Sequence, residues 1–145
     1  MRIIILIILF TACIRVVGQD SSFKEQKKHI DSLIVLIDMN NDLSFKAVQG
    51  RDSIFGDYTG SFLYRRSDKT VVKIESKTIF DTDASKVFYY VDDNLIRLSD
   101  KRVIYYYLDN FLVDELGKKV STPETGDLLI FEKSIKNLLK ILLSD

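Results

Sequence analysis

Few residues of this chain have the type and spacing that catalysis requires. His29 is the only histidine and Cys13 the only cysteine, so we expect no tetrahedral zinc site of histidines and cysteines. A serine hydrolase built on His29 would need a nucleophile elbow, and the chain has no G-x-S-x-G motif. We therefore predict a protein that is not an enzyme and that holds neither a metal nor a cofactor.

The acidic residues predict turns rather than a catalytic or metal site. Asp81-Thr82-Asp83 and Asp92-Asp93-Asn94 are rich in oxygen atoms, but the distal glutamate of a calcium loop is absent, and aspartate and asparagine favour turns. Asp114 and Glu115 are neighbours on an expected strand, where adjacent side chains point to opposite faces. The two carboxylates therefore cannot share an acid–base site.

The first 18 residues have the pattern of a secretory signal peptide. Met1-Arg2 supplies a positive start, and Ile3–Phe10 is an unbroken apolar run that is too short to span a bilayer. Val16-Val17-Gly18 then offers small residues for cleavage. We expect cleavage after Gly18 and a single mature domain over residues 19–145, secreted or exported to the periplasm and without a membrane span.

A lipoprotein is the alternative interpretation of the same leader. Thr11-Ala12-Cys13 is similar to the end of a bacterial lipobox, in which case Cys13 would carry a lipid anchor to the envelope. Cleavage after Gly18 would remove Arg2 and Arg15 with the leader and leave the mature domain slightly acidic. That charge balance gives no electrostatic footprint for nucleic acid.

Apolar residues at helical spacing predict a helix at each end of the mature domain. Over residues 22–39, Ser22 and Glu25 form a capping box. Near the other end, Thr122 is an expected N-cap with Pro123 at the first helical position. The apolar positions that recur with this period are Phe23, Ile30, Leu33, Ile34 and Ile37 in the first helix, and Leu128, Leu129, Phe131, Ile135, Leu138, Leu139 and Leu142 in the second.

Between the helices, apolar residues alternate with polar ones and short turns follow at regular intervals. We interpret Leu43–Tyr58 as a short strand followed by a loop, and Ser61–Arg66 with Thr70–Ser76 as a first hairpin. About six strands result, each joined to the next by a short turn. This pattern predicts an α+β domain with an antiparallel β-meander and with both helices packed on one face of the sheet.

The stretch Phe88–Leu116 contains the same hairpin twice. Phe88–Asp93 is an aromatic run that ends in two polar residues, and Tyr105–Asn110 repeats it 17 residues later. Two-residue turns would place Val91 opposite Asn94 and Leu108 opposite Phe111. This register assigns each side chain of both hairpins to one face of the sheet.

The two faces differ in composition. We expect the helices on the mostly aliphatic face, which carries Val87, Tyr89, Val91, Ile96, Leu98, Ile104, Tyr106, Leu108, Phe111 and Val113, together with Leu63, Val72 and Ile74. The opposite face interleaves aromatic with charged side chains: Phe62, Tyr64, Phe88, Tyr90, Tyr105 and Tyr107 with Arg66, Lys73, Glu75, Arg97 and Asp114. Such a face either stabilises the sheet through cross-strand pairs or contacts a partner, because Tyr and Arg are enriched at interfaces.

The leading hypothesis is therefore a non-enzymatic binding domain that contacts a protein or other envelope component. The expected contact residues are Tyr64, Tyr90, Tyr105, Tyr107 and Arg97. One alternative is a carrier of a small molecule or lipid, with an apolar cavity between sheet and helices. Another is a hydrolase of an unrecognised type, with carboxylates or His29 brought together in a cleft.

Overall fold

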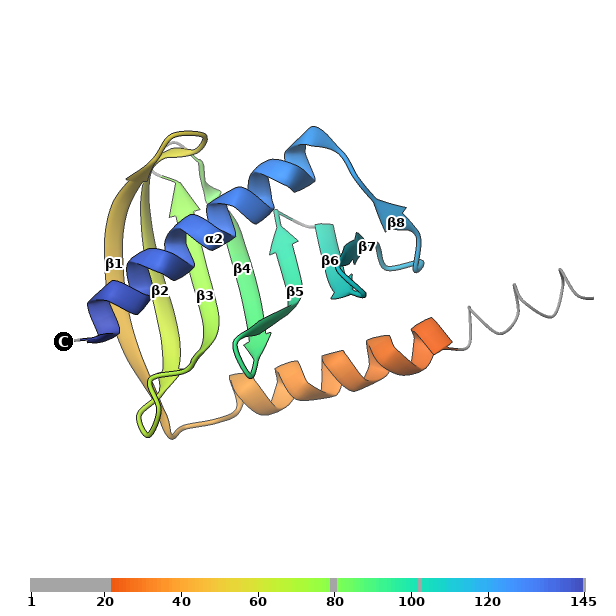
Figure 1. Ribbon diagram of the computed structural model, residues 1–145, viewed down its shortest axis with the longest axis horizontal. Helices are drawn as coiled ribbons and strands as arrows, with labels where there is room; N and C mark the ends of the chain where they lie inside the picture. The colour runs from red at the N-terminus through yellow and green to blue at the C-terminus, as the bar shows by residue number, and fades with distance from the viewer. Residues whose placement is uncertain (1–21, 79–80, 102, 145) are drawn as a thin grey trace, which may run out of the picture.

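An open, eight-stranded antiparallel sheet forms the centre of the computed structural model, which describes residues 22–78, 81–101 and 103–144 (Figure 1). A helix over residues 22–38 precedes the sheet, and α2 (Pro123–Ser144) follows it. The strands are β1 (Leu43–Asp52), β2 (Gly56–Arg65), β3 (Val71–Thr78), β4 (Asp81–Val91), β5 (Asn94–Asp100), β6 (Val103–Leu108), β7 (Phe111–Val113) and β8 (Lys119–Val120). They lie in the sheet in the order in which they occur in the chain.

The predicted α+β class, the antiparallel meander and the two terminal helices are confirmed. The sheet has eight strands rather than about six, because Leu43–Tyr58 forms the whole of β1 and the beginning of β2 instead of a short strand and a loop. The short β8 adds the last strand. The expected signal peptide and the lipobox at Cys13 lie outside the described residues.

The helix α2 begins where its capping residues predict. The Thr122 hydroxyl accepts a hydrogen bond from the Thr125 N–H at 3.3 Å, and the Thr125 hydroxyl accepts one from the Thr122 N–H at 2.9 Å. Pro123 occupies the first helical position, where a missing N–H costs nothing. This reciprocal cap fixes the residue at which the helix begins.

The two predicted two-residue turns are also confirmed. Val91 pairs with Asn94, and Leu108 pairs with Phe111. All four turn residues have positive φ, with Asp92 at 48°, Asp93 at 67°, Asp109 at 50° and Asn110 at 67°. Positive φ at both central residues is the mark of a type I′ turn, whose twist matches that of the flanking strands.

A β-bulge in each of two hairpins changes the faces that the sequence predicts. Val72 has no partner between the pairs Leu63–Lys73 and Tyr64–Val71. Ile96 likewise has none between the pairs Tyr89–Arg97 and Tyr90–Leu95. Beyond each extra residue the strand presents the opposite set of side chains to a given face. Ile74 and Leu98 therefore lie on the face of Phe62, Phe88 and Tyr90, which we call the tyrosine face, and Lys73 and Arg97 lie on the other one.

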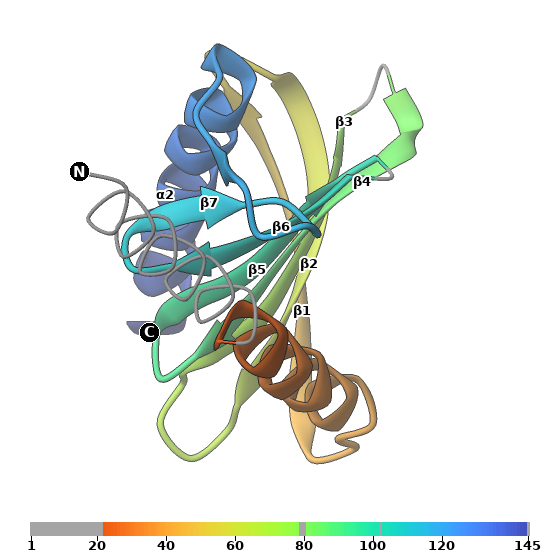
Figure 2. The same cartoon turned by 90° about the vertical axis from the view of Figure 1, so that its right-hand side faces the viewer.

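The two helices lie on opposite faces of the sheet, so the expected packing of both on one face is wrong (Figure 2). α2 covers the tyrosine face, where its Phe131 packs among Phe88, Tyr90 and Leu98. The N-terminal helix covers the face of Tyr89 and Tyr106. The bulges explain the difference, because they transfer aliphatic residues to the tyrosine face and make it too apolar to remain in water.

The type I′ geometry at Asn110 generates a prediction about stability. Asn110→Val should lower the free energy of unfolding by about 1–2 kcal/mol, because a β-branched residue is strained at positive φ. Asn110→Gly, the matched control, should leave the free energy unchanged or raise it, because glycine adopts this conformation without strain. Urea unfolding followed by circular dichroism measures both. Equal stability of the two variants would contradict the turn assignment.

Candidate functional site

The tyrosine face is a covered core rather than an open contact surface. Tyr90 is only 1 % exposed. Its hydroxyl donates a hydrogen bond to Glu132 Oε1 of α2 at 2.9 Å, and Lys136 Nζ lies 4.9 Å from the centre of its ring. Burial, followed by the nearby charge of Glu132, raises the pKa of Tyr90. This tyrosine therefore binds α2 to the sheet and is not accessible to a partner.

The other predicted contact residues are not brought together into one site. Tyr64, Tyr105 and Tyr107 are half-buried and pack around the core beneath α2. Arg97 lies on the opposite face, where the bulge at Ile96 places it, and its Nη1 is 3.3 Å from Asp31 Oδ1. The half-buried tyrosines at the margin of α2 remain predicted contact residues, but Arg97 belongs to a different set of interactions.

That set is a row of polar side chains which crosses the sheet beneath the N-terminal helix. Lys73, Tyr89, Arg97 and Tyr106 are successive cross-strand neighbours on β3, β4, β5 and β6. We call these four residues the polar row. Lys73 Nζ lies 5.1 Å and Arg97 Cζ 5.3 Å from the centre of the Tyr89 ring, so a cation flanks this ring on each side.

Two carboxylates of the N-terminal helix bind the polar row. Asp38 accepts hydrogen bonds from Lys73 Nζ at 2.8 Å and from the Tyr89 hydroxyl at 3.0 Å. Asp31 accepts hydrogen bonds from Arg97 Nη1 at 3.3 Å and from the Tyr106 hydroxyl at 3.0 Å. The two aspartates are seven residues, or about two helical turns, apart, and therefore project from the same side of the helix.

The polar row is suited to holding the helix rather than to catalysis. Burial, the hydrogen bond to Asp31 and the charge of Asp31 raise the pKa of Tyr106 to about 12. Burial is likewise the largest cause that raises the pKa of Tyr89. Burial lowers the pKa of Lys73, but its hydrogen bonds to Asp38 and Tyr89 outweigh this and raise it overall. At neutral pH both tyrosines are therefore protonated donors, and each cation faces a carboxylate.

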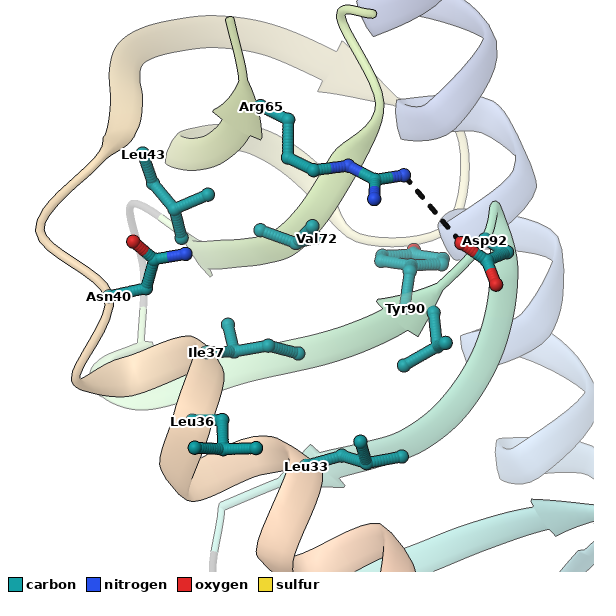
Figure 3. A pocket seen from close by; sticks show the side chains of 10 residues that line it. Leu33, Leu36, Ile37, Asn40, Leu43, Arg65, Val72, Tyr90 and Asp92 are labelled. Atoms are coloured by element: carbon teal, nitrogen blue, oxygen red, sulfur yellow. Dashed lines mark ion pairs between the residues drawn. The ribbon is translucent and has the colours of Figure 1, made fainter. Parts of the chain in front are cut away.

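An apolar groove lies beside the polar row, where the N-terminal helix ends and the chain enters β1 (Figure 3). It has a volume of about 200 Å³. The helix contributes Leu33, Leu36 and Ile37, and the strands contribute Leu43, Val72, Tyr90 and Val91. Val72 is the extra residue of the first bulge. The same irregularity that turns Lys73 toward the helix therefore also supplies part of the wall of the groove.

Apolar side chains beside the groove are exposed to solvent. Leu36, which also lines the groove, is 66 % exposed. Phe45, which is 65 % exposed, lies two residues beyond Leu43 on β1 and on the same side of the strand. Exposed apolar residues are ordinary when single, but contiguous ones mark interaction sites. These residues border a groove, which makes them candidates for contact with a partner.

One end of the groove is polar. Arg65 Nη2 lies 3.6 Å from Asp92 Oδ1, as the dashed line in Figure 3 marks, and 3.2 Å from Asp68 Oδ2. Arg65 Nε is buried and has no hydrogen-bond acceptor among the described residues. The groove thus combines apolar walls with an ion-paired arginine at one end.

The described residues bring together little else that could do chemistry. His29 is exposed on the N-terminal helix, and among residues 22–78, 81–101 and 103–144 no group of three or more His, Cys, Asp or Glu could hold a metal ion. Lys86 is buried, 3.5 Å from Asp100 Oδ1 and 4.6 Å from the centre of the Phe55 ring. It is a covered ion pair rather than an accessible nucleophile. No helix in the described ranges is long and apolar enough to cross a membrane.

Comparisons with protein-family models, with curated proteins and with solved structures found no match for this chain. Its function must therefore be argued from its own residues.

The sequence alone predicted neither the polar row nor the groove, for two physical reasons. Asp31 and Asp38 lie off the apolar side of the helix and read as solvent-facing residues. Lys73 and Arg97 were assigned to the opposite face, because a β-bulge leaves no clear signature in the sequence. The seven-residue spacing of the two aspartates is a helical signal that could have indicated that they act together.

The geometry of Tyr106 generates a prediction about pH. Because the folded-state pKa of Tyr106 is about 12 and its ordinary value is 10.0, the protonated form stabilises the folded state. This contribution is complete below pH 10 and is lost as the pH rises toward 12. Tyr106→Phe should therefore flatten the decline in stability over that interval, as chemical unfolding at a series of pH values would show.

Two aspartate variants test the cause of that shift. Asp31→Asn should lower the pKa of Tyr106, because the negative charge beside its hydroxyl is removed. Asp38→Asn, the matched control, should leave it unchanged, because Asp38 binds Tyr89 instead. Spectroscopic titration of tyrosinate, corrected with Tyr106→Phe, measures the pKa. An Asp31→Asn protein that titrates like the wild type would contradict the contact.

Proposed function

We propose that the chain is a non-enzymatic binding domain of the secreted or periplasmic space, which accommodates an apolar side chain of a partner in the groove beside the N-terminal helix. The observation that carries the proposal is the exposed apolar surface of Leu36 and Phe45 beside a groove lined by Leu33, Ile37 and Leu43. The expected location rests on the leader sequence alone.

The size and chemistry of the groove favour a side chain of a partner over a whole ligand. Its volume of about 200 Å³ is below the roughly 300–1,000 Å³ of sites that enclose a small molecule. Burying one large aliphatic or aromatic side chain contributes about 1.5–3 kcal/mol. A protein or other envelope component can supply such a side chain.

A small apolar molecule in the same groove is the second candidate, since most of the lining is apolar. The interior between α2 and the sheet gives no support to a carrier, because side chains fill it. Phe62, Phe88, Phe131 and Leu139 are almost completely buried there in one core cluster. A hydrolase gains no support from the described residues, in which His29 is exposed and no three or more His, Cys, Asp or Glu side chains form a metal-binding group.

The proposal predicts that a charge on the rim of the groove abolishes binding. A photo-crosslinking amino acid at position 36 should capture a defined component of an envelope extract, and Leu36→Glu should weaken the binding of that purified component by about tenfold or more, because burial of the leucine is lost. Lipid in an organic extract of the purified protein, rather than a crosslinked protein, would favour the small-molecule candidate.

Ile130 provides the matched control. It is an exposed aliphatic residue of the other helix, 56 % exposed against 66 % for Leu36. Crosslinker at position 130 should not capture the component, and Ile130→Glu should bind it as the wild type does. Both glutamate variants should keep the wild-type circular-dichroism spectrum. Equal capture from both positions, or full binding by Leu36→Glu, would refute the groove as the binding site.

A further inference from the structure

The two edges of the sheet differ in length and in protection. β8, at one edge, has two residues. β1, at the other edge, has ten residues, pairs with β2 in unbroken register and contains no proline. Such a strand presents an open row of N–H and C=O groups, which proteins usually protect with charges, bulges or proline. One edge of the meander is therefore a regular strand, β1, whose outer backbone groups can form hydrogen bonds with a further strand.

The charged residues of β1 do not protect this edge. Arg51 forms two hydrogen bonds with the carboxylate of Asp57 on β2. Lys46 Nζ donates a hydrogen bond to the carbonyl oxygen of Leu142, at the end of α2, at 2.9 Å. The charge of Arg51 is thus paired with a carboxylate, and the ammonium of Lys46 keeps its charge but is directed to α2.

Apolar side chains lie beside the edge on both faces of the sheet. Phe45, opposite Leu63 in the register, is exposed on the side of the N-terminal helix. On the other side, the C-terminal end of α2 reaches β1 (Figure 1), and Val48 of β1 is half-buried against the core beneath this helix. A strand added to β1 would therefore bring the exposed Phe45 into contact beside the new backbone hydrogen bonds.

From these observations we infer that β1 pairs antiparallel with β1 of a second copy of this chain, about a two-fold axis at Ala47. In this register Lys46 faces Val48 of the second copy, and Phe45 faces Gln49, so that no like charges are opposed. Asp52 lies outside the pairing, which leaves its carboxylate free to accept hydrogen bonds from the Ile54 and Phe55 N–H groups of the turn.

A second copy fits this edge better than a flexible peptide does. The partner strand is already ordered by its own sheet, so that pairing does not cost the entropy of ordering a free segment. The interface is isologous, and each copy therefore contributes its Phe45. The pairing does not use Leu36 or the groove, so it goes beyond the proposed binding function and can fail independently of it.

Charge variants at Ala47 test the dimer, because this exposed residue would face its own symmetry mate. Light scattering after size exclusion should give a dimer for the wild type that dissociates over about a hundredfold dilution. Ala47→Glu and Ala47→Lys should each weaken association by about tenfold, because like charges meet at the axis. An equal mixture of the two variants should recover the dimer, because opposite charges then meet there.

The controls separate this interface from other causes. Reductant is present throughout, because Cys13 could link two chains, and thermal unfolding should show that both Ala47 variants are folded. Leu36→Glu should remain a dimer, since the groove is not involved. A wild-type protein that stays monomeric at high concentration overturns the inference, whether or not β1 binds a strand of another protein. The inference is also wrong if both charged variants dimerise like the wild type, or if an equal mixture of them does not form the dimer.

Discussion

Large apolar and aromatic side chains on both faces of one sheet are the constraint from which the rest of this structure follows. The tyrosine face buries Phe62, Phe88 and Tyr90, and the opposite face buries Tyr89 and Tyr106. Each face requires a cover, because the hydrophobic effect disfavours leaving such surface in water. The chain supplies one helix before the meander and one after it, and these two helices cover opposite faces.

The two covers are held by different physical means. α2 packs through an almost completely buried aromatic core around Phe131, with the Tyr90–Glu132 hydrogen bond as its main polar contact. The N-terminal helix has a smaller apolar contact, centred on Ile30 and Ile34, and adds the four hydrogen bonds of Asp31 and Asp38 to the polar row. Because both carboxylates are about two-fifths exposed, these contacts fix the position of the helix more than they add stability.

The N-terminal helix also leaves part of its face of the sheet uncovered. Its last turn ends beside β1, where Leu36, Leu43 and Val72 line the groove and Phe45 remains in water. The long free edge of β1 lies at the same corner of the molecule. The surface features that indicate binding are therefore concentrated there, whereas the tyrosine face is occupied by the α2 core.

The sequence by itself determined the α+β class, the meander, the helix start at Thr122–Pro123 and the type I′ turns, because these depend on local spacing, capping and turn chemistry. Only the tertiary structure decided which face each strand presents beyond Val72 and Ile96. A bulge inserts one residue and exchanges the two faces, and its position depends on packing between strands rather than on local composition. The same exchange brought Arg97 to Asp31 and moved the candidate site from the tyrosines to the groove.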